Sequence, residues 1–181
     1  MVVRLAAVGA AFTLALCAGC RDGASPALAD LGPRVSAWVP DSAAVLGHAY
    51  YSGFATATHA VVSDGLRWAA TWNQFWGTLE PKPPASSVDF ATERVLLVAL
   101  GMRFSGGYDI AVDSVVGYQG GTTVYLTGRS PGQGCIVTAA LSAPAQLVRV
   151  PRPPEPVTFQ QRDVVTPCTC PACAPPIEPR G

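Results

Sequence analysis

The sequence predicts an α+β domain in which one aromatic-rich helix packs against an antiparallel sheet of about five to seven strands. Three observations favour this fold class. Short runs with alternating apolar and polar residues recur along the chain, for example over 108–115. A single stretch, 66–79, instead places its large aromatic residues at helical spacing. The chain also contains 18 glycines and 17 prolines, which suits a strand-rich fold with many turns.

The N-terminus has the pattern of an export signal over residues 1–19. Arg4 supplies a positive start, and 5–18 is an uncharged apolar run that is shorter than the roughly 20 residues of a membrane-spanning helix. Small residues then precede Cys20, whose position resembles the lipobox of bacterial lipoproteins, although Cys17 stands where a branched aliphatic residue is usual. We therefore expect lipidation of Cys20 and a protein anchored to a membrane of the cell envelope, facing the periplasm or the exterior. The alternative is cleavage by the ordinary signal peptidase.

Residues 20–45 are predicted to form a flexible tether. They are mostly small, and Pro26, Pro33 and Pro40 interrupt any long periodicity. Trp38 is the exception, because this aromatic side chain could dock on the domain. We place the folded domain at 46–163 and a tail rich in proline and cysteine at 164–181.

The first elements of the domain are predicted from local patterns. Residues 50–54 and 57–62 indicate a first strand pair or one bent strand. Ser63 or Asp64 can cap a helix that begins beside them. The proline-rich stretch 80–84 ends this helix. Its apolar face is predicted to form core rather than a binding surface, and it consists of Trp68, Trp72, Phe75, Trp76 and Leu79.

The next two strands are predicted to pair as an antiparallel hairpin, or through a slightly longer loop of the same topology. Residues 94–100 form a short apolar run rich in β-branched side chains, and 108–115 alternates as a half-buried strand does. Gly106 and Gly107 can adopt the positive φ values of a tight reversal between them.

The remaining elements follow from turns and alternation. Residues 122–127 and 145–150 alternate as strands, and a glycine-rich loop at 130–135 separates them. Residues 136–141 could form a strand or one helical turn. A last edge strand is predicted at 157–162, after the prolines that follow Val150.

Several short motifs together resemble the PrcB C-terminal domain family, which is named for a lipoprotein subunit of a bacterial surface protease complex. The resemblance covers about 53–162. It departs from the family pattern at Phe104 and Ser105, where a proline and a threonine are usual. It implies a non-catalytic partner or assembly factor. The motifs are Trp72-x-x-Phe75-Trp76, Val88-Asp89-Phe90, the run 95–101, Gly106-Gly107-Tyr108, Pro131-Gly-x-Gly-Cys135 and Pro144-Ala-x-x-Val-x-Val150-Pro151.

A binding role is also plausible from the residues themselves. The edge of an antiparallel sheet carries unpaired N–H and C=O groups, to which an extended segment of another protein can add a strand. The loops 102–107 and 130–134 would flank such a site if they lie at one end of the sheet. The alternative is that their glycines only make turns. The predicted partner-binding residues are Arg103, Phe104, Ser105, Gly106, Gly107 and Tyr108.

Other function classes find little support. The formal net charge is zero with 13% charged residues, so the basic surface of a nucleic-acid-binding protein is not expected. His48 and His59 lie near no recognisable nucleophile, and Asp89 and Glu93 belong to no evident catalytic motif. We predict no enzymatic activity, no cofactor and no metal.

The cysteines leave several interpretations open. Exported proteins occupy an oxidising compartment, so Cys135, Cys168, Cys170 and Cys173 are disulfide candidates. The alternatives are free or intermolecular thiols, a redox pair at Cys170 and Cys173, or a zinc site.

The sequence as a whole thus predicts an exported, lipid-anchored module that binds another exported protein, such as a protease. The competing hypotheses are a thiol-redox or metal-binding protein and a structural envelope lipoprotein.

Overall fold

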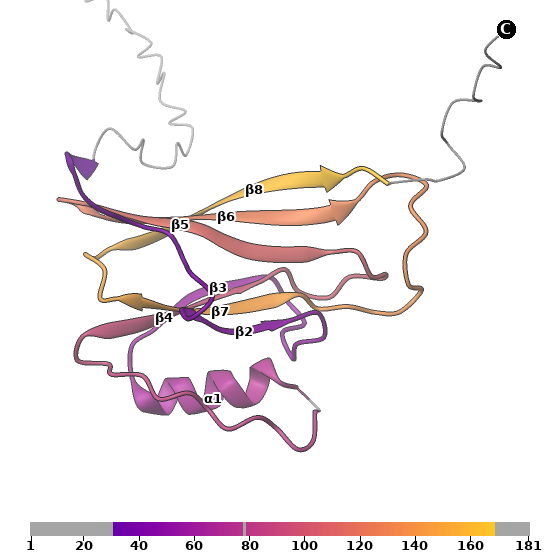
Figure 1. Ribbon diagram of the computed structural model, residues 1–181, viewed down its shortest axis with the longest axis horizontal. Coiled ribbons are helices and arrows are strands. Elements are labelled where there is room, and N and C mark those ends of the chain that lie inside the picture. The colour runs from indigo at the N-terminus through magenta and orange to yellow at the C-terminus, as the bar shows by residue number, and fades with distance from the viewer. Residues whose placement is uncertain (1–30, 78, 169–181) are drawn as a thin grey trace, which may run out of the picture.

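Two four-stranded sheets and one helix form three stacked layers in the computed structural model, which describes residues 31–77 and 79–168 (Figure 1). Sheet A has the order β1-β5-β6-β8, and sheet B has the order β2-β7-β4-β3. Helix α1 covers the face of sheet B that points away from sheet A. The elements are β1 (Arg34–Trp38), β2 (Val45–Ala49), β3 (Thr58–Val62), α1 (Gly65–Phe75), β4 (Glu93–Ala99), β5 (Asp109–Tyr118), β6 (Gly121–Pro131), β7 (Ala145–Pro151) and β8 (Val157–Thr166).

Strand β4 is buried on both of its faces. Leu96 and Val98 pack into the cluster between the two sheets, whereas Val95 and Leu97 pack into the cluster beneath α1. A strand covered on both sides has no solvent-facing positions, so its sequence is continuously apolar instead of alternating. β4 and its neighbour β7, whose side chains also pack into both clusters, are therefore the two central strands of the three-layer core.

Helix α1 forms largely as the sequence predicts. The Asp64 carboxylate accepts a hydrogen bond from the Arg67 N–H at 2.8 Å and caps the first turn. Trp68, Trp72 and Phe75 are buried against sheet B, which confirms that the aromatic face is core. The helix ends at Phe75, earlier than predicted, because Gly77 adopts a φ of +53° and reverses the chain before the prolines are reached.

The predicted hairpin of 94–100 and 108–115 is wrong. Strand β4 lies in sheet B and β5 in sheet A, so the segment between them crosses from one sheet to the other. Since both faces of β4 are apolar, it needs a layer on each side, and β5 belongs to the sheet that covers one of these faces, where its apolar side chains pack in the same cluster as Leu96 and Val98. Gly106 and Gly107 shape this crossing loop instead of a tight turn.

The fold also differs from the predicted single antiparallel sheet of five to seven strands. In the described part of the chain, eight strands form two sheets, and β8 pairs with β6 in parallel. Strand β7 ends in sheet B near the start of β6, and the short segment 152–156 carries the chain across to sheet A. The Thr122 N–H donates to the Pro156 carbonyl at 2.8 Å, which fixes this entry point. β8 therefore starts beside the start of β6 and must run in the same direction.

Some segments differ from their predicted roles. Residues 34–38, within the predicted tether, form strand β1, and Trp38 packs against the cluster between the sheets. Residues 50–54 make only an isolated bridge from Tyr51 to Ala143, and 136–141 forms no regular element. Strand β8 extends beyond the predicted domain end at 163. The predicted signal peptide, Cys20 and most of the tail lie outside the described residues. Within the part of the chain that is described, no helix has the length and apolar character needed to cross a membrane.

Candidate functional site

The loops 50–57, 100–108 and 132–144 come together at one end of the sandwich, which we call the loop end. The N–H of Ser52 donates to the Ala143 carbonyl at 2.9 Å, and the N–H of Met102 donates to the Ala55 carbonyl at 3.0 Å. Arg103 and Ser142 exchange two backbone hydrogen bonds of 2.7 and 2.9 Å. Backbone bonding thus joins three loops that are far apart in the sequence.

The crossing loop 102–107 runs antiparallel to 136–142. In addition to the Arg103–Ser142 pair, the Gly106 N–H donates to the Thr138 carbonyl at 2.9 Å. Gly107 has a φ of +84°, and a Cβ built on it would lie 3.0 Å from a Val137 methyl carbon, so only glycine fits there without strain. The two loops singled out in the sequence therefore do meet at one end of the fold.

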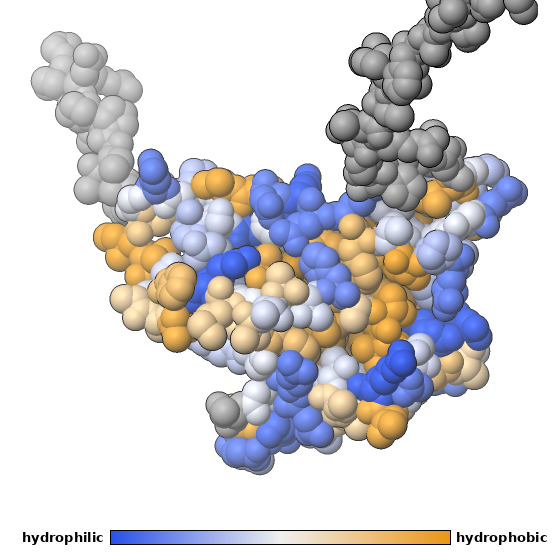
Figure 2. Space-filling view, turned by 180° about the vertical axis from the view of Figure 1, so that it is seen from behind, coloured by the Kyte–Doolittle hydropathy of each residue, from blue (hydrophilic) through white to orange (hydrophobic). Residues whose placement is uncertain are grey.

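Large apolar side chains are exposed at the loop end. Phe104 is 88% exposed, and three other side chains from the same two loops are also largely exposed. Figure 2 shows apolar surface at its left, which corresponds to the end at which the arrow of β8 stops in Figure 1. Exposed apolar groups that gather in this way usually mark an interaction surface. We define the loop-end surface as Met102, Phe104, Ile136 and Leu141.

A hollow of about 540 Å³ adjoins the loop-end surface. Its walls come from the crossing loop and from the ends of β6 and β8. Gly128 leaves room in this wall, because a Cβ there would lie 2.8 Å from an Asp163 carboxylate oxygen. The lining residues that carry polar or aromatic groups are Arg103, Phe104, Tyr108, Arg129, Ser130, Gln161 and Asp163.

Two cations face this hollow. The Arg103 guanidinium lies 5.8 Å from the centre of the Tyr108 ring, which is a cation–π distance. Within the described residues, neither Arg103 nor Arg129 has a carboxylate within ion-pair distance. Asp163 is the one acid in the lining, and it accepts a hydrogen bond of 2.6 Å from Gln161. Arg129 lies opposite Asp109 across the β5–β6 pair, and its charge contributes to the lowered pKa of that carboxyl group, so Arg103 is the cation better placed to meet an additional carboxylate.

The six predicted partner-binding residues divide into two groups. Arg103, Phe104 and Tyr108 line the hollow. Ser105 and Gly106 instead hold the loop in place, since the Ser105 carbonyl accepts from the Ser142 hydroxyl at 2.7 Å. Gly107 provides the close approach described above. Sequence reasoning missed Ile136, Leu141, Arg129 and Asp163, and only Ile136 had a local signal, as an apolar residue beside a glycine-rich loop.

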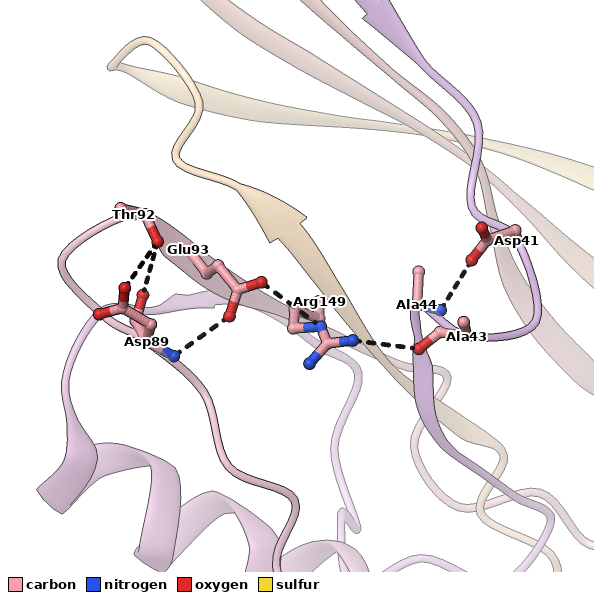
Figure 3. Close-up of polar contacts among 7 residues, drawn as sticks. All are labelled: Asp41, Ala43, Ala44, Asp89, Thr92, Glu93 and Arg149. Carbon is pink, nitrogen blue, oxygen red and sulfur yellow. Dashed lines mark hydrogen bonds and ion pairs between the residues drawn. The ribbon is translucent and has the colours of Figure 1, made fainter.

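Asp89 and Glu93 have structural roles at the opposite end of the fold (Figure 3). The Glu93 carboxylate accepts from the Asp89 N–H at 3.1 Å and lies 3.6 Å from the Arg149 guanidinium. Asp89 accepts from the Thr92 hydroxyl at 2.9 Å. These contacts close the turn before β4 and link it to β7, so both carboxylates already have partners.

His48 and Asp109 link the two sheets near the loop end. The His48 Nε2 atom of β2 lies 2.6 Å from an Asp109 carboxylate oxygen of β5. This hydrogen bond raises the pKa of His48, against the effect of burial, and lowers the pKa of Asp109. His59 behaves differently, because it stacks on Phe159 at 5.4 Å and burial lowers its pKa.

The His48–Asp109 pair predicts a pH-dependent stability. Because the folded-state pKa of His48 is raised, its contribution is complete below the unfolded pKa of 6.5 and is lost as the pH rises through the higher folded value. Because the pKa of Asp109 is lowered, its contribution is present above 3.8 and is lost as the pH falls through the lower folded value. The pair is therefore strongest between about pH 4 and 6.5.

Urea unfolding of the wild type and a His48→Gln variant at pH 5.5 and 8 checks this expectation. The stability advantage of the wild type over the variant should shrink at pH 8. The lowered pKa of His59 changes stability with pH in the opposite direction. His59 is present in both proteins, so its effect cancels when their stabilities are subtracted. An advantage of equal size at both pH values would contradict the assigned ion pair.

The cysteines are partly placed. Cys135 and Cys168 form a disulfide that joins the turn after β6 to the end of β8. Cys170 and Cys173 lie outside the described residues. Within 31–77 and 79–168, no group of three or more His, Cys, Asp or Glu side chains is arranged to hold a metal ion.

Comparison with known proteins gives one match. Residues 94–151 match the family model described as PrcB C-terminal, which confirms the family resemblance that the motifs indicated. The match runs from β4 to β7 and is narrower than the predicted span of 53–162. No curated protein and no solved structure matches.

Proposed function

We propose, from the match of residues 94–151 to the PrcB C-terminal family, that this protein is a non-catalytic docking subunit of an exported protease complex. The matched stretch includes both loops that carry the loop-end surface. The part of the chain that resembles the family is therefore also the part that exposes Phe104. This exposed apolar surface is the observation that carries the proposal.

The position of the chain ends supports docking through the loop end. Leu31 lies at the opposite end of the sandwich, where its carbonyl accepts from the Gly120 N–H at 2.9 Å (Figure 1). A lipid on Cys20 would precede it by only a short segment. An anchor at Cys20 would therefore hold the opposite end of the domain nearest the membrane. Attached in this way, the loop-end surface would stay free to meet proteins in the surrounding space.

The chemistry of the site indicates what the partner presents. Phe104 and its apolar neighbours favour apolar side chains, and the guanidinium groups of Arg103 and Arg129 favour a carboxylate next to them. The partner segment would therefore combine apolar residues with at least one acidic residue. Asp163 in the same hollow disfavours a strongly acidic run, which would bring like charges together.

Crosslinking in membranes that contain the lipidated protein tests this proposal, followed by binding of the purified partner. We expect recovery of a protease or of another exported subunit of its complex, and a Phe104→Ser variant should bind that partner at least about tenfold more weakly. Leu66→Ser is the matched control, because Leu66 is 84% exposed on α1, away from the loop end.

Two results would argue against the docking function. One is equal binding of the partner by the Phe104→Ser variant and the wild type. The other is recovery of no exported protein that also binds when purified. A double Arg103→Gln, Arg129→Gln variant then tests the carboxylate separately, and unchanged affinity would remove the acidic residue from the proposed recognition.

A further inference from the structure

The two sheets of the described chain have four edge strands, and β8 differs from the other three. Strands β1, β2 and β3 each have five residues, and the pairings of β1 and β2 contain a register shift. Strand β8 has ten residues, and its pairing with β6 runs without a shift from Val157 to Thr166. Short length and bulges are common protections of an edge against other strands. Strand β8 has neither of these protections.

The backbone groups of β8 alternate between β6 and the open side of the sheet. The N–H of Thr122 donates to the Pro156 carbonyl at 2.8 Å, and the N–H of Gly132 donates to the Thr166 carbonyl at 2.9 Å. Because the direction of these groups alternates along a strand, the even-numbered residues of β8 bond to β6. The odd-numbered residues from 157 to 165 point their N–H and C=O groups to the open side. Within 31–77 and 79–168, no strand pairs with this side.

The side chains of the same odd-numbered residues face the space between the two sheets. Val157 and Phe159 pack against the cluster between the sheets. Gln161 and Asp163 line the hollow beside the loop-end surface. The Phe159 ring stacks on His59 of β3 at 5.4 Å, so the open edges of both sheets lie on the same side of the sandwich. A strand added to β8 would therefore cover these side chains as well as the backbone groups.

We propose that the partner's segment binds as an extended strand that adds to β8 on its open side. This inference rests on the proposed docking function and gives the form of the segment that docks. The N–H and C=O groups of the odd-numbered residues supply main-chain hydrogen bonds, and the side chains beside them supply specificity. At the loop end the added strand reaches the hollow that Arg103 lines, so the edge and the hollow form one continuous site.

The inward side chains of β8 determine which segments fit. Residues directly opposite each other in adjacent strands place their side chains on the same face. The partner residue opposite Phe159 is therefore apolar, because it packs against that ring. The residue opposite Asp163 is polar or basic, because an acid there would face a like charge. The partner is thus a segment of high strand propensity whose inward side chains change from apolar to polar toward the loop end.

Asp163 also argues against a second copy of this chain as the partner. In a symmetric antiparallel pair of β8 strands, odd-numbered residues oppose odd-numbered residues, because opposite side chains share a face. Over most of β8, every such register places Arg162 or Asp163 opposite its own copy, or places Asp163 opposite an apolar residue. Like charges that face each other, or a charge against an apolar side chain, are unfavourable. A segment of another protein is free of this constraint.

A display library of random linear peptides, selected on the purified protein with its disulfide intact, supplies the probe. Enriched peptides are synthesised, and amide hydrogen exchange in β8 is followed by NMR with and without them. In the protein alone, the odd-numbered amides of β8 should exchange faster than the even-numbered ones. A bound peptide should slow exchange at the odd-numbered amides. This alternation distinguishes an added strand from docking through side chains alone.

Two substitutions at one position test the edge itself. Gln161→Pro removes an N–H on the open side and places the proline ring there, and it leaves the hydrogen bonds to β6 in place. Gln161→Ala removes the same side chain and keeps the N–H. Gln161→Pro should weaken peptide binding about tenfold or more, and Gln161→Ala by less than about threefold. Slow exchange at the even-numbered amides verifies that β8 remains paired with β6 in both variants.

Three results would overturn strand addition. The first is slow exchange of the odd-numbered amides in the protein alone, since the edge would then be occupied by the chain itself or by a second copy. The second is equal binding of the peptides by Gln161→Pro and the wild type. The third is a selection that enriches no peptide, or bound peptides that leave exchange in β8 unchanged. None of these results removes the role of Phe104 in docking, and peptides that add to β8 would support this inference even if no exported protease is recovered.

Discussion

Replacing Phe75 by alanine is expected to lower the free energy of unfolding by about 3–5 kcal/mol. Phe75 is 0% exposed and packs in the cluster that joins α1 to sheet B. Its ring lies directly over Gly47 of β2, where a built Cβ would approach to 2.8 Å, and it packs edge-on against Trp76 at 5.2 Å. The side chains around it belong to the same close-packed cluster, so the substitution leaves a cavity.

Urea unfolding at constant pH, with the disulfide oxidised, measures this loss. Leu66→Ala is the matched control, because Leu66 lies on the same helix and is exposed, so its replacement should change the free energy by no more than about 0.5 kcal/mol. If Phe75→Ala costs less than about 1 kcal/mol, α1 is not packed on sheet B as described. A loss of the expected size is a large part of the 5–15 kcal/mol that typically stabilises a domain.

Local patterns predicted the individual elements better than their arrangement. Helix α1 and strands β6 and β7 carry clear periodicity and were placed close to their observed positions. The two-sheet sandwich was not predicted, because the apolar run of β4 shows that both faces are buried but does not show what covers each face. One covering layer was assigned correctly to the helix, and the other turned out to be sheet A.

The edges of the fold were hardest to predict. Strand β1 lies between prolines, and its side chains are mostly exposed, so it lacks the apolar alternation of a strand. Its pairing with β5 is a long-range backbone interaction that the composition of the segment does not reveal. The parallel direction of β8 likewise depends on where the chain crosses between sheets.

In the candidate site, too, the residues of one local segment could be predicted, whereas those contributed by distant strands could not. The glycines of the crossing loop indicated Arg103, Phe104 and Tyr108 as a group, and the structure places all three on one hollow. Arg129 and Asp163 complete that hollow from β6 and β8. Their contribution depends on strand register and on the crossing between sheets, which single-sequence patterns do not determine.

Removing the disulfide with a double Cys135→Ser, Cys168→Ser variant is expected to cost about 3–4 kcal/mol of stability. The bond closes a loop with a sequence separation of 33 residues, and the entropy gained by the unfolded chain when such a loop opens corresponds to this value. Urea unfolding measures the loss, and a reducing agent should destabilise the wild type but not the variant. An unchanged unfolding midpoint in the variant would contradict a stabilising disulfide.

The same variant should also loosen the loop-end surface, because Ile136 directly follows Cys135 and the Gly132 N–H donates to the Thr166 carbonyl at 2.9 Å beside the bond. Hydrogen exchange should therefore become faster in 132–142 and at the end of β8, and not in α1. The single Cys168→Ser variant tests whether another cysteine of the tail can pair with Cys135. If it retains more stability than the double variant, Cys170 or Cys173 replaces Cys168 as the partner of Cys135. If the two variants are equally unstable, the position of Cys168 at the end of β8 determines the pairing, and the neighbouring thiols do not replace it.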